Sequence, residues 1–285
     1  MQPLPDVKEA ASFTRPAPHR PTAPAGADVP AISFSHIHKQ FTRSDGTRFD
    51  VLRDVSFDVP NGEIVAIVGP SGSGKTTLLN MAAGLVLPDR GRIAVMGREL
   101  ERDVDWSRVG YMFQDDRLLP WRTAIDNVGL ALEAGSTARG ARRRRARAGL
   151  EMVGLKDFLT AYPHQLSGGM RSRVALARSL VVEPDLLLMD EPFSRLDAQT
   201  RSTMHDELLR IHALRRVSIL FVTHDVEEAV ILANHVVMLS PRPGRVDRRV
   251  DVSLPHPRLG TPAAGTLVTE LRGSLAQADT EEMVS

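Results

Sequence analysis

Short apolar runs separated by helical patterns organise most of the chain. Val55, Phe57 and Val59 alternate with polar residues, which predicts a half-buried strand. Unbroken apolar runs at 64–68, 186–189 and 218–222 are typical of strands buried on both faces of a parallel sheet. Helical patterns over 200–214 and 225–233 follow two of these runs. Buried strands that alternate with helices predict an α/β fold with a mostly parallel sheet.

The middle of the chain has a different pattern. Residues 123–182 show helical periodicity and no convincing strand, and Ala146, Leu150 and Val153 fall on one helical face. We interpret residues 115–182 as an α-helical subdomain inserted in the core. Proline and alanine dominate residues 1–30, which predicts a disordered tail without a secretory signal. Residues 251–285 are polar and irregular, which predicts a weakly ordered C-terminal tail.

Composition narrows the possible functions. The 285 residues are 42% hydrophobic, and their formal net charge is +1. No apolar run is long enough for a membrane-spanning helix. The chain has no cysteine, which excludes disulfides, zinc–thiolate sites and thiol catalysis. The near-zero net charge argues against bulk electrostatic capture of nucleic acid.

A glycine-rich motif follows the apolar run at 64–68. The motif G-x-x-x-x-G-K-[ST] comprises Gly69, Pro70, Ser71, Gly72, Ser73, Gly74, Lys75 and Thr76, with Thr77 in the helix that it opens. The glycines let backbone N–H groups curl around phosphate oxygens, and a helix N-terminus adds positive potential. Lys75 can reach the β- and γ-phosphates, and the Thr76 hydroxyl can bind Mg²⁺. This motif predicts binding of a nucleoside triphosphate.

Acidic residues and a histidine end the two other apolar strands. Asp190 and Glu191 follow the run at 186–189, at the strand end where open α/β sheets bind ligands. We expect Asp190 to hold the metal, and Glu191 to polarise an attacking water. His224 follows the run at 218–222, which places it near the γ-phosphate if the strands are neighbours.

Ser167, Gly168 and Gly169 open another helix, at the far end of the helical insertion. Their exposed N–H groups can form a second anion-binding nest. One subunit is not expected to bring two such nests to the same phosphate. We therefore predict a head-to-tail dimer, in which each nest closes over the nucleotide of the partner copy.

Together these motifs resemble those of the ATP-binding subunits of ATP-binding-cassette (ABC) transporters over residues 31–250. The resemblance identifies Gln114 as the Q-loop, LSGGM at 166–170 as the signature, Ser194-Arg195-Leu196-Asp197 as the D-loop and His224 as the H-loop. Phe41 occupies the position of an aromatic that stacks on adenine. Two residues depart from the family pattern. Met170 replaces glutamine in the signature, and Arg195 replaces alanine in the D-loop.

The resemblance implies a P-loop core, an antiparallel N-terminal β subdomain and an ATPase cycle. ATP would lie against Phe41, residues 69–77 and Asp197, and against Ser167, Gly168 and Gly169 of the second copy. Thr76, Gln114 and Asp190 would hold Mg²⁺. Glu191, His224 and Gln114 would act in hydrolysis. The implied partners are transmembrane permease subunits and, indirectly, a solute-binding protein, with no nucleic acid. The implied location is the cytoplasmic face of the inner membrane.

Residues 118–128 and 240–245 resemble the importer branch for nitrate, sulfonates and taurine. Another importer or an exporter is an alternative. A DNA-repair ATPase is more remote, because no long coiled coil separates Lys75 from Asp190. Leu118, Leu119 and Trp121 suit either a permease interface or the core of the helical insertion.

An arginine-rich stretch belongs to none of the motifs described above. It comprises Arg139, Arg142, Arg143, Arg144, Arg145 and Arg147. No aromatic residues are interleaved with these arginines to stack on bases. We favour a solvated helix face, with contact to anionic lipid headgroups as the alternative.

Overall fold

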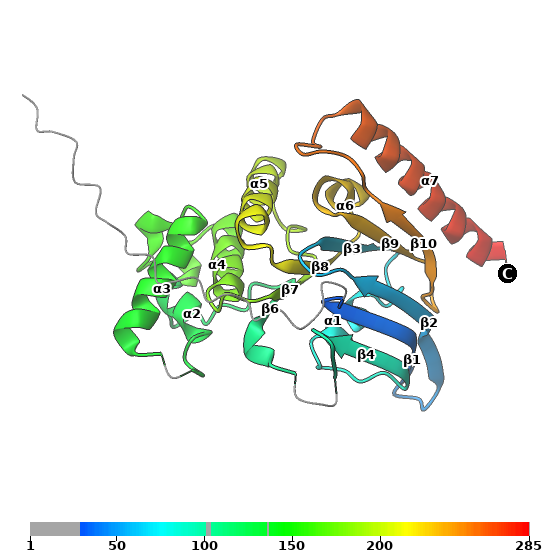
Figure 1. Cartoon of the computed structure of the whole chain (residues 1–285), viewed down its shortest axis with the longest axis horizontal. Coiled ribbons are helices and arrows are strands. Elements are labelled where there is room, and N and C mark those ends of the chain that lie inside the picture. Colours follow the sequence, from blue (N-terminus) through cyan, green and yellow to red (C-terminus); the bar gives the residue numbers. More distant parts are fainter. Residues whose placement is uncertain (1–28, 101–103, 136, 285) are drawn as a thin grey trace, which may run out of the picture.

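The computed structural model describes residues 29–100, 104–135 and 137–284. The predicted tail over residues 1–30 lies outside this part of the chain except for its last two positions. Two sheets and the helices around them form the fold (Figure 1). The α/β class with a mostly parallel main sheet, predicted from the apolar runs, is confirmed.

The larger sheet has six strands in the order β10-β9-β3-β8-β7-β6. Its strands are β3 (Ile64–Val68), β6 (Val109–Met112), β7 (Leu186–Asp190), β8 (Ser218–Thr223), β9 (His235–Leu239) and β10 (Val246–Asp251). All neighbouring pairs are parallel except β9 with β10. The strands β3, β8, β7 and β6 are therefore neighbours, and their carboxyl ends meet at one edge.

The smaller sheet is antiparallel, as the family resemblance implied. Its four strands run in the order β2-β1-β4-β5. They are β1 (Ile32–Thr42), β2 (Arg48–Val59), β4 (Arg90–Val95) and β5 (Arg98–Glu99). Helix α1 (Lys75–Ala82) contacts both sheets, and its Leu78, Leu79 and Met81 are completely buried.

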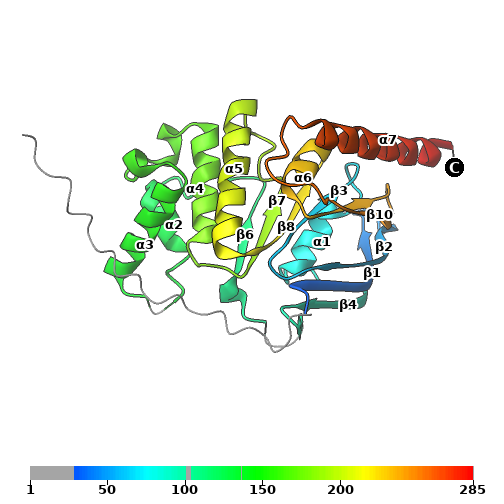
Figure 2. The ribbon, with the colours of Figure 1, turned by 45° about the horizontal axis from the view of Figure 1, so that its top comes forward.

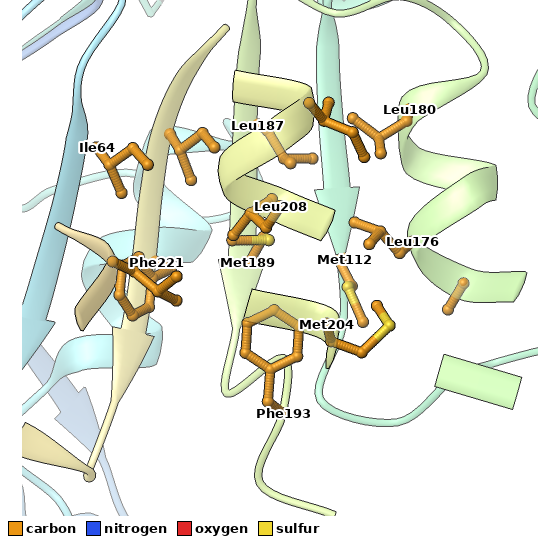
Figure 3. Packing of buried hydrophobic residues seen from close by; sticks show 14 of the residues in the cluster. Ile64, Met112, Leu176, Leu180, Leu187, Met189, Phe193, Met204, Leu208 and Phe221 are labelled. Carbon is orange, nitrogen blue, oxygen red and sulfur yellow. The ribbon is translucent and has the colours of Figure 1, made fainter. Parts of the chain in front are cut away.

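Alternate residues of the central strands enter two different cores. Val65 and Ile67 of β3 pack in the core that contains α1, whereas Ala66 and Val68 pack on the other face of the sheet. That second face is covered by α5 (Ala198–Arg215), α6 (Val226–Leu232) and α4 (Gly168–Leu180). In Figure 3, Leu208 of α5 lies against Met189 of β7. The period-two burial follows from strand geometry.

Helices occupy the region between β6 and β7. They are α2 (Ala124–Leu130), α3 (Arg139–Met152) and α4, joined through the 3₁₀ turns η2 (Lys156–Phe158) and η3 (Pro163–Gln165). The three helices contact one another and lie on the far side of β6 from α1 (Figures 1 and 2). A further turn, η1 (Trp106–Arg108), precedes β6.

The expectation of an irregular C-terminal segment is wrong. Residues Pro262–Val284 form helix α7, which packs on α6. Ala264, Val268 and Leu271 recur at helical spacing and are buried. The overall composition of the segment does not reveal this spacing, which gains its meaning from packing against α6. Within the described residues, no helix combines the length and the apolar character needed to cross a bilayer.

Candidate functional site

The predicted phosphate loop connects the end of β3 to the start of α1. Gly74 caps α1 with φ 94°, and a Cβ atom there would lie 2.5 Å from Leu52, so this position requires glycine. Lys75 is almost fully buried, and its Nζ donates to the carbonyl oxygens of Gly69, at 2.7 Å, and Pro70, at 2.8 Å. Burial lowers the pKa of Lys75, while Glu191 and Asp190 oppose this shift.

Ser73 supports a ligand at this loop. Its side chain is completely buried, and within the described chain its Oγ has no hydrogen-bond partner. Buried hydroxyl groups are normally hydrogen-bonded, so an unpaired one marks a place for a ligand atom. A phosphate oxygen can accept the hydrogen bond that this hydroxyl does not make within the described chain.

Asp190, at the end of β7, faces the start of α1. Thr76 Oγ1 donates to Asp190 Oδ1 at 3.1 Å. Burial raises the pKa of Asp190, whereas the hydrogen bond from Thr76 opposes the shift. A hydroxyl and a carboxylate are the oxygen ligands that Mg²⁺ prefers. The donor set therefore fits the predicted metal.

Glu191 lies between the Q-loop and H-loop residues. Its Oε2 accepts from Gln114 Nε2 at 2.9 Å and lies 3.4 Å from His224 Nδ1. The structure thus brings these three predicted residues together from β6, β7 and β8. Glu191 has φ 43°, a left-handed conformation that is strained for a residue other than glycine. Such strain is typical of functional sites.

A buried pair behind His224 was not found by sequence reasoning. Glu228 Oε2 accepts from Thr223 Oγ1 at 2.5 Å, and Thr223 Oγ1 also accepts from the backbone N–H of Asp225 at 3.0 Å. His205 Nε2 lies 3.8 Å from Glu228 Oε1, and both side chains are buried. Through the hydroxyl of Thr223, Glu228 is therefore connected to the backbone N–H of Asp225, on the other side of His224. In the sequence, Glu228 is one acid among several in a helical segment. Only the packing of α6 shows that its side chain is buried.

We expect Glu228→Ala to lower kcat for ATP hydrolysis on the order of tenfold with little change in KM, because small displacements of positioned groups slow chemistry. Glu228→Gln keeps an acceptor oxygen for Thr223 and should retain most activity. Steady-state ATPase kinetics test both variants. Exposed Glu227→Ala is the matched control. Equal losses in the Gln and Ala variants would contradict this positioning role.

The signature residues lie apart from the phosphate loop of the same chain. Ser167 and Gly168 are exposed at the start of α4, and Ser167 Oγ accepts from the N–H of Met170 at 3.2 Å. Strands β6, β7 and β8 separate α4 from α1 (Figure 1). One chain therefore leaves this nest open to solvent. Gly169 is tightly placed, because a Cβ atom there would lie 2.9 Å from Thr200.

The D-loop residues have partners within the chain. Asp197 caps α5 by accepting from the N–H of Thr200 at 2.9 Å, and this bonding lowers the pKa of its carboxyl. Arg195, the departure from the family pattern, lies 2.6 Å from Asp115 Oδ1. This exposed ion pair joins the D-loop to the residue after Gln114.

Two arginines of α4 hold the segment after Gln114, and sequence reasoning did not find them. Arg171 Nε donates to Asp116 Oδ2 at 2.9 Å. Arg178 donates to the carbonyl oxygens of Asp116 and Arg117 at 2.6 and 2.9 Å. The signature helix and the Q-loop segment are therefore mechanically connected.

The candidate adenine contact lies on the antiparallel sheet. Phe41 of β1 is 38% exposed, with its ring centroid 6.5 Å from that of Phe49. Strand β2 of the same sheet is also connected to the phosphate loop. Leu52 of β2 forms a β-bridge with Gly244, and Gly244 packs so closely on the loop that a Cβ atom on it would lie 2.0 Å from Ser73 O. An exposed ring is available to stack on a planar base.

Comparisons with known proteins agree with this geometry. The family model described as "ABC transporter" matches residues 52–194, half of the chain. A taurine import ATP-binding protein from Rhizobium johnstonii is 43% identical over 221 residues, which cover 78% of this chain and 84% of the relative.

The chain belongs to the ABC transporter family.

Other relatives in the family carry related descriptions. An aliphatic sulfonates import ATP-binding protein from Bacillus licheniformis is 44% identical, over 74% of this chain and 81% of its own length. A nitrate import ATP-binding protein from Synechococcus elongatus is 40% identical, over 80% of this chain and 35% of its own length. A dimeric ATP-binding cassette in a post-hydrolysis state, bound to ADP and Pi, superposes with a TM-score of 0.70 at 29% identity, covering 78% of this chain and 99% of that one.

Proposed function

We propose that this ABC protein binds and hydrolyses ATP to power a membrane importer for a small anion such as taurine, an aliphatic sulfonate or nitrate. The observation that carries the ATPase assignment is the position of Glu191. Its carboxylate lies between Gln114 and His224, on the strand that also brings Asp190 to Thr76. The arrangement supplies a candidate base and candidate metal ligands at one sheet edge.

In the proposed reaction, Glu191 takes a proton from the water that attacks the γ-phosphorus. The bond from this phosphorus to the β,γ-bridging oxygen breaks, and ADP leaves with the bridging oxygen. His224 and Gln114 orient that water and the carboxylate. Lys75 and the backbone N–H groups of residues 71–77 balance the negative charge of the phosphates. Thr76, Asp190 and Gln114 would hold Mg²⁺, which supplies further charge neutralisation when it is bound.

The proposed active form has two copies. Ser167, Gly168 and Gly169 of one copy complete the phosphate site of the other, and Asp197 contributes from the same interface. The exposure of Ser167 and Gly168 at the start of α4 supports this arrangement, as does the dimeric cassette among the similar structures. The helical region over 115–182 would transmit dimer closure through the contacts of Arg171 and Arg178 with the Q-loop segment.

The transported solute is proposed from the relatives named above, whose descriptions name the import of taurine, nitrate and aliphatic sulfonates. The proposed partners are two permease subunits and, through them, a solute-binding protein. The proposed location is the cytoplasmic face of the inner membrane. Of the residues that suit either a permease interface or the core, Leu118 is buried in the core of the helical region and Trp121 is exposed.

The test is reconstitution of the chain with candidate permease subunits and a candidate solute-binding protein. We expect ATPase activity that rises when taurine, an alkanesulfonate or nitrate is supplied together with the binding protein. Stimulation by a different solute would assign another importer. Stimulation by a solute added on the ATP-binding side of the membrane, without the binding protein, would indicate an exporter. Stimulation by DNA would favour the DNA-repair ATPase.

A further inference from the structure

Three arginines of α3 line a surface depression together with two aromatic side chains. The depression has a volume of about 480 Å³, and its lining includes Arg139, Arg142, Arg143, Trp121 and Tyr162. We refer to these five residues as the arginine–tryptophan surface. The aromatics come from loops before α2 and before α4, so folding adds them to an arginine stretch that lacks aromatics in the sequence.

The carboxylates at this depression already have partners. Glu133 accepts from Arg122 at 2.6 Å and 3.3 Å, and Asp126 accepts from Thr123 Oγ1 at 2.6 Å. In the part of the chain that the structure describes, no ion pair engages Arg139, Arg142 or Arg143. Counted over its whole lining, the depression has four arginines against two carboxylates, which leaves a local excess of positive charge.

These arginines do not serve the stability of their own helix. Arg139 and Arg142 lie in the first turn of α3, which has no acidic residue and no side-chain cap. Cations at this end are disfavoured by the helix dipole. Their charges on this side of α3 remain available to an anionic partner outside the chain.

Trp121 is held in an exposed position. Its side chain is 71% exposed, and the loop that carries it is fastened by Asn127, which is completely buried. The Asn127 side chain accepts from Leu119 N at 2.7 Å and donates to the carbonyl oxygens of Leu119 and Arg122 at 3.2 and 3.0 Å. A rigid loop thus presents a large apolar ring to solvent beside cationic groups.

We propose that the arginine–tryptophan surface binds the anionic headgroups of a phospholipid bilayer. Arginines supply charge complementarity to phosphate, and tryptophan and tyrosine rings favour the headgroup level of a membrane. Trp121 then lies at the interface while Arg139 and Arg143 contact lipid phosphates. The inference builds on the proposed membrane placement but requires no permease.

The test uses the full-length chain and vesicles of phosphatidylcholine, with or without phosphatidylglycerol, at low ionic strength. In a Trp106→Phe background, Trp121 is the remaining tryptophan, since the chain has two. We expect co-flotation with the anionic vesicles and a blue shift of Trp121 emission, both reversed by salt. Phosphatidylcholine alone should give neither effect.

The charge requirement is tested with Arg139→Gln/Arg143→Gln. Loss of two arginines should lower the partition coefficient about 30-fold. Arg90→Gln/Arg92→Gln is the matched control, because both residues are exposed arginines on β4, outside the surface. The control should bind as the unsubstituted protein does.

Three outcomes overturn the proposal. They are absence of binding to anionic vesicles, equal loss in the two double variants, and tighter binding of single-stranded DNA than of anionic vesicles through the same arginines. Solution ATPase activity should be unchanged in Arg139→Gln/Arg143→Gln, so failure of lipid binding is separable from failure of the proposed ATPase.

Discussion

Glu191→Gln should lower the rate of ATP hydrolysis about 1,000-fold, within the range that a general base contributes. The amide is nearly isosteric with the carboxylate and can still accept from Gln114, but it cannot take a proton from water. Contacts of the phosphates with Lys75 and the loop are untouched, so ATP binding should persist. Phosphate release and equilibrium binding of a labelled ATP analogue measure the two effects separately.

The same variant should accumulate as an ATP-bound dimer, because closure requires the triphosphate and reopening requires its hydrolysis. Gel filtration with and without ATP detects this species. Glu227→Gln is the matched control, because Glu227 is exposed and lies outside the Gln114–Glu191–His224 cluster. Unchanged turnover in Glu191→Gln would remove Glu191 from its proposed role as the base.

Lys75→Ala should weaken ATP binding about 100-fold, since charged hydrogen bonds to phosphate contribute strongly to binding. Lys75 Nζ now bonds to the carbonyl oxygens of Gly69 and Pro70, so its ammonium group already lies inside the loop. Alanine leaves the helix start intact but removes the only side-chain cation of the motif. Equilibrium titration with a fluorescent ATP analogue measures the effect.

Lys156→Ala is the matched control, because Lys156 is exposed in η2, outside the phosphate loop. It should bind ATP as the unsubstituted protein does. Thermal unfolding should show that Lys75→Ala remains folded. Undiminished affinity in a folded Lys75→Ala protein would contradict the assignment of residues 69–77 as the phosphate cradle.

Local signals accounted for the central part of the fold. The apolar run at 64–68 coincides with β3, and the glycine-rich motif after it forms the loop before α1. Such runs predict well because burial on both faces leaves an unbroken apolar pattern. The C-terminal helix escaped prediction because its buried positions, such as Val268 and Leu271, are sparse and acquire meaning only against α6.

The sequence by itself determined the residue types of the candidate site, because the phosphate-loop motif and the strand-end acids depend on spacing along one segment. Only the tertiary structure decided which distant residues meet. It placed Glu191 between Gln114 and His224, anchored the His224 loop on Glu228, and set Trp121 beside the arginines of α3. Such meetings depend on strand order and helix packing, which no local pattern of side chains specifies.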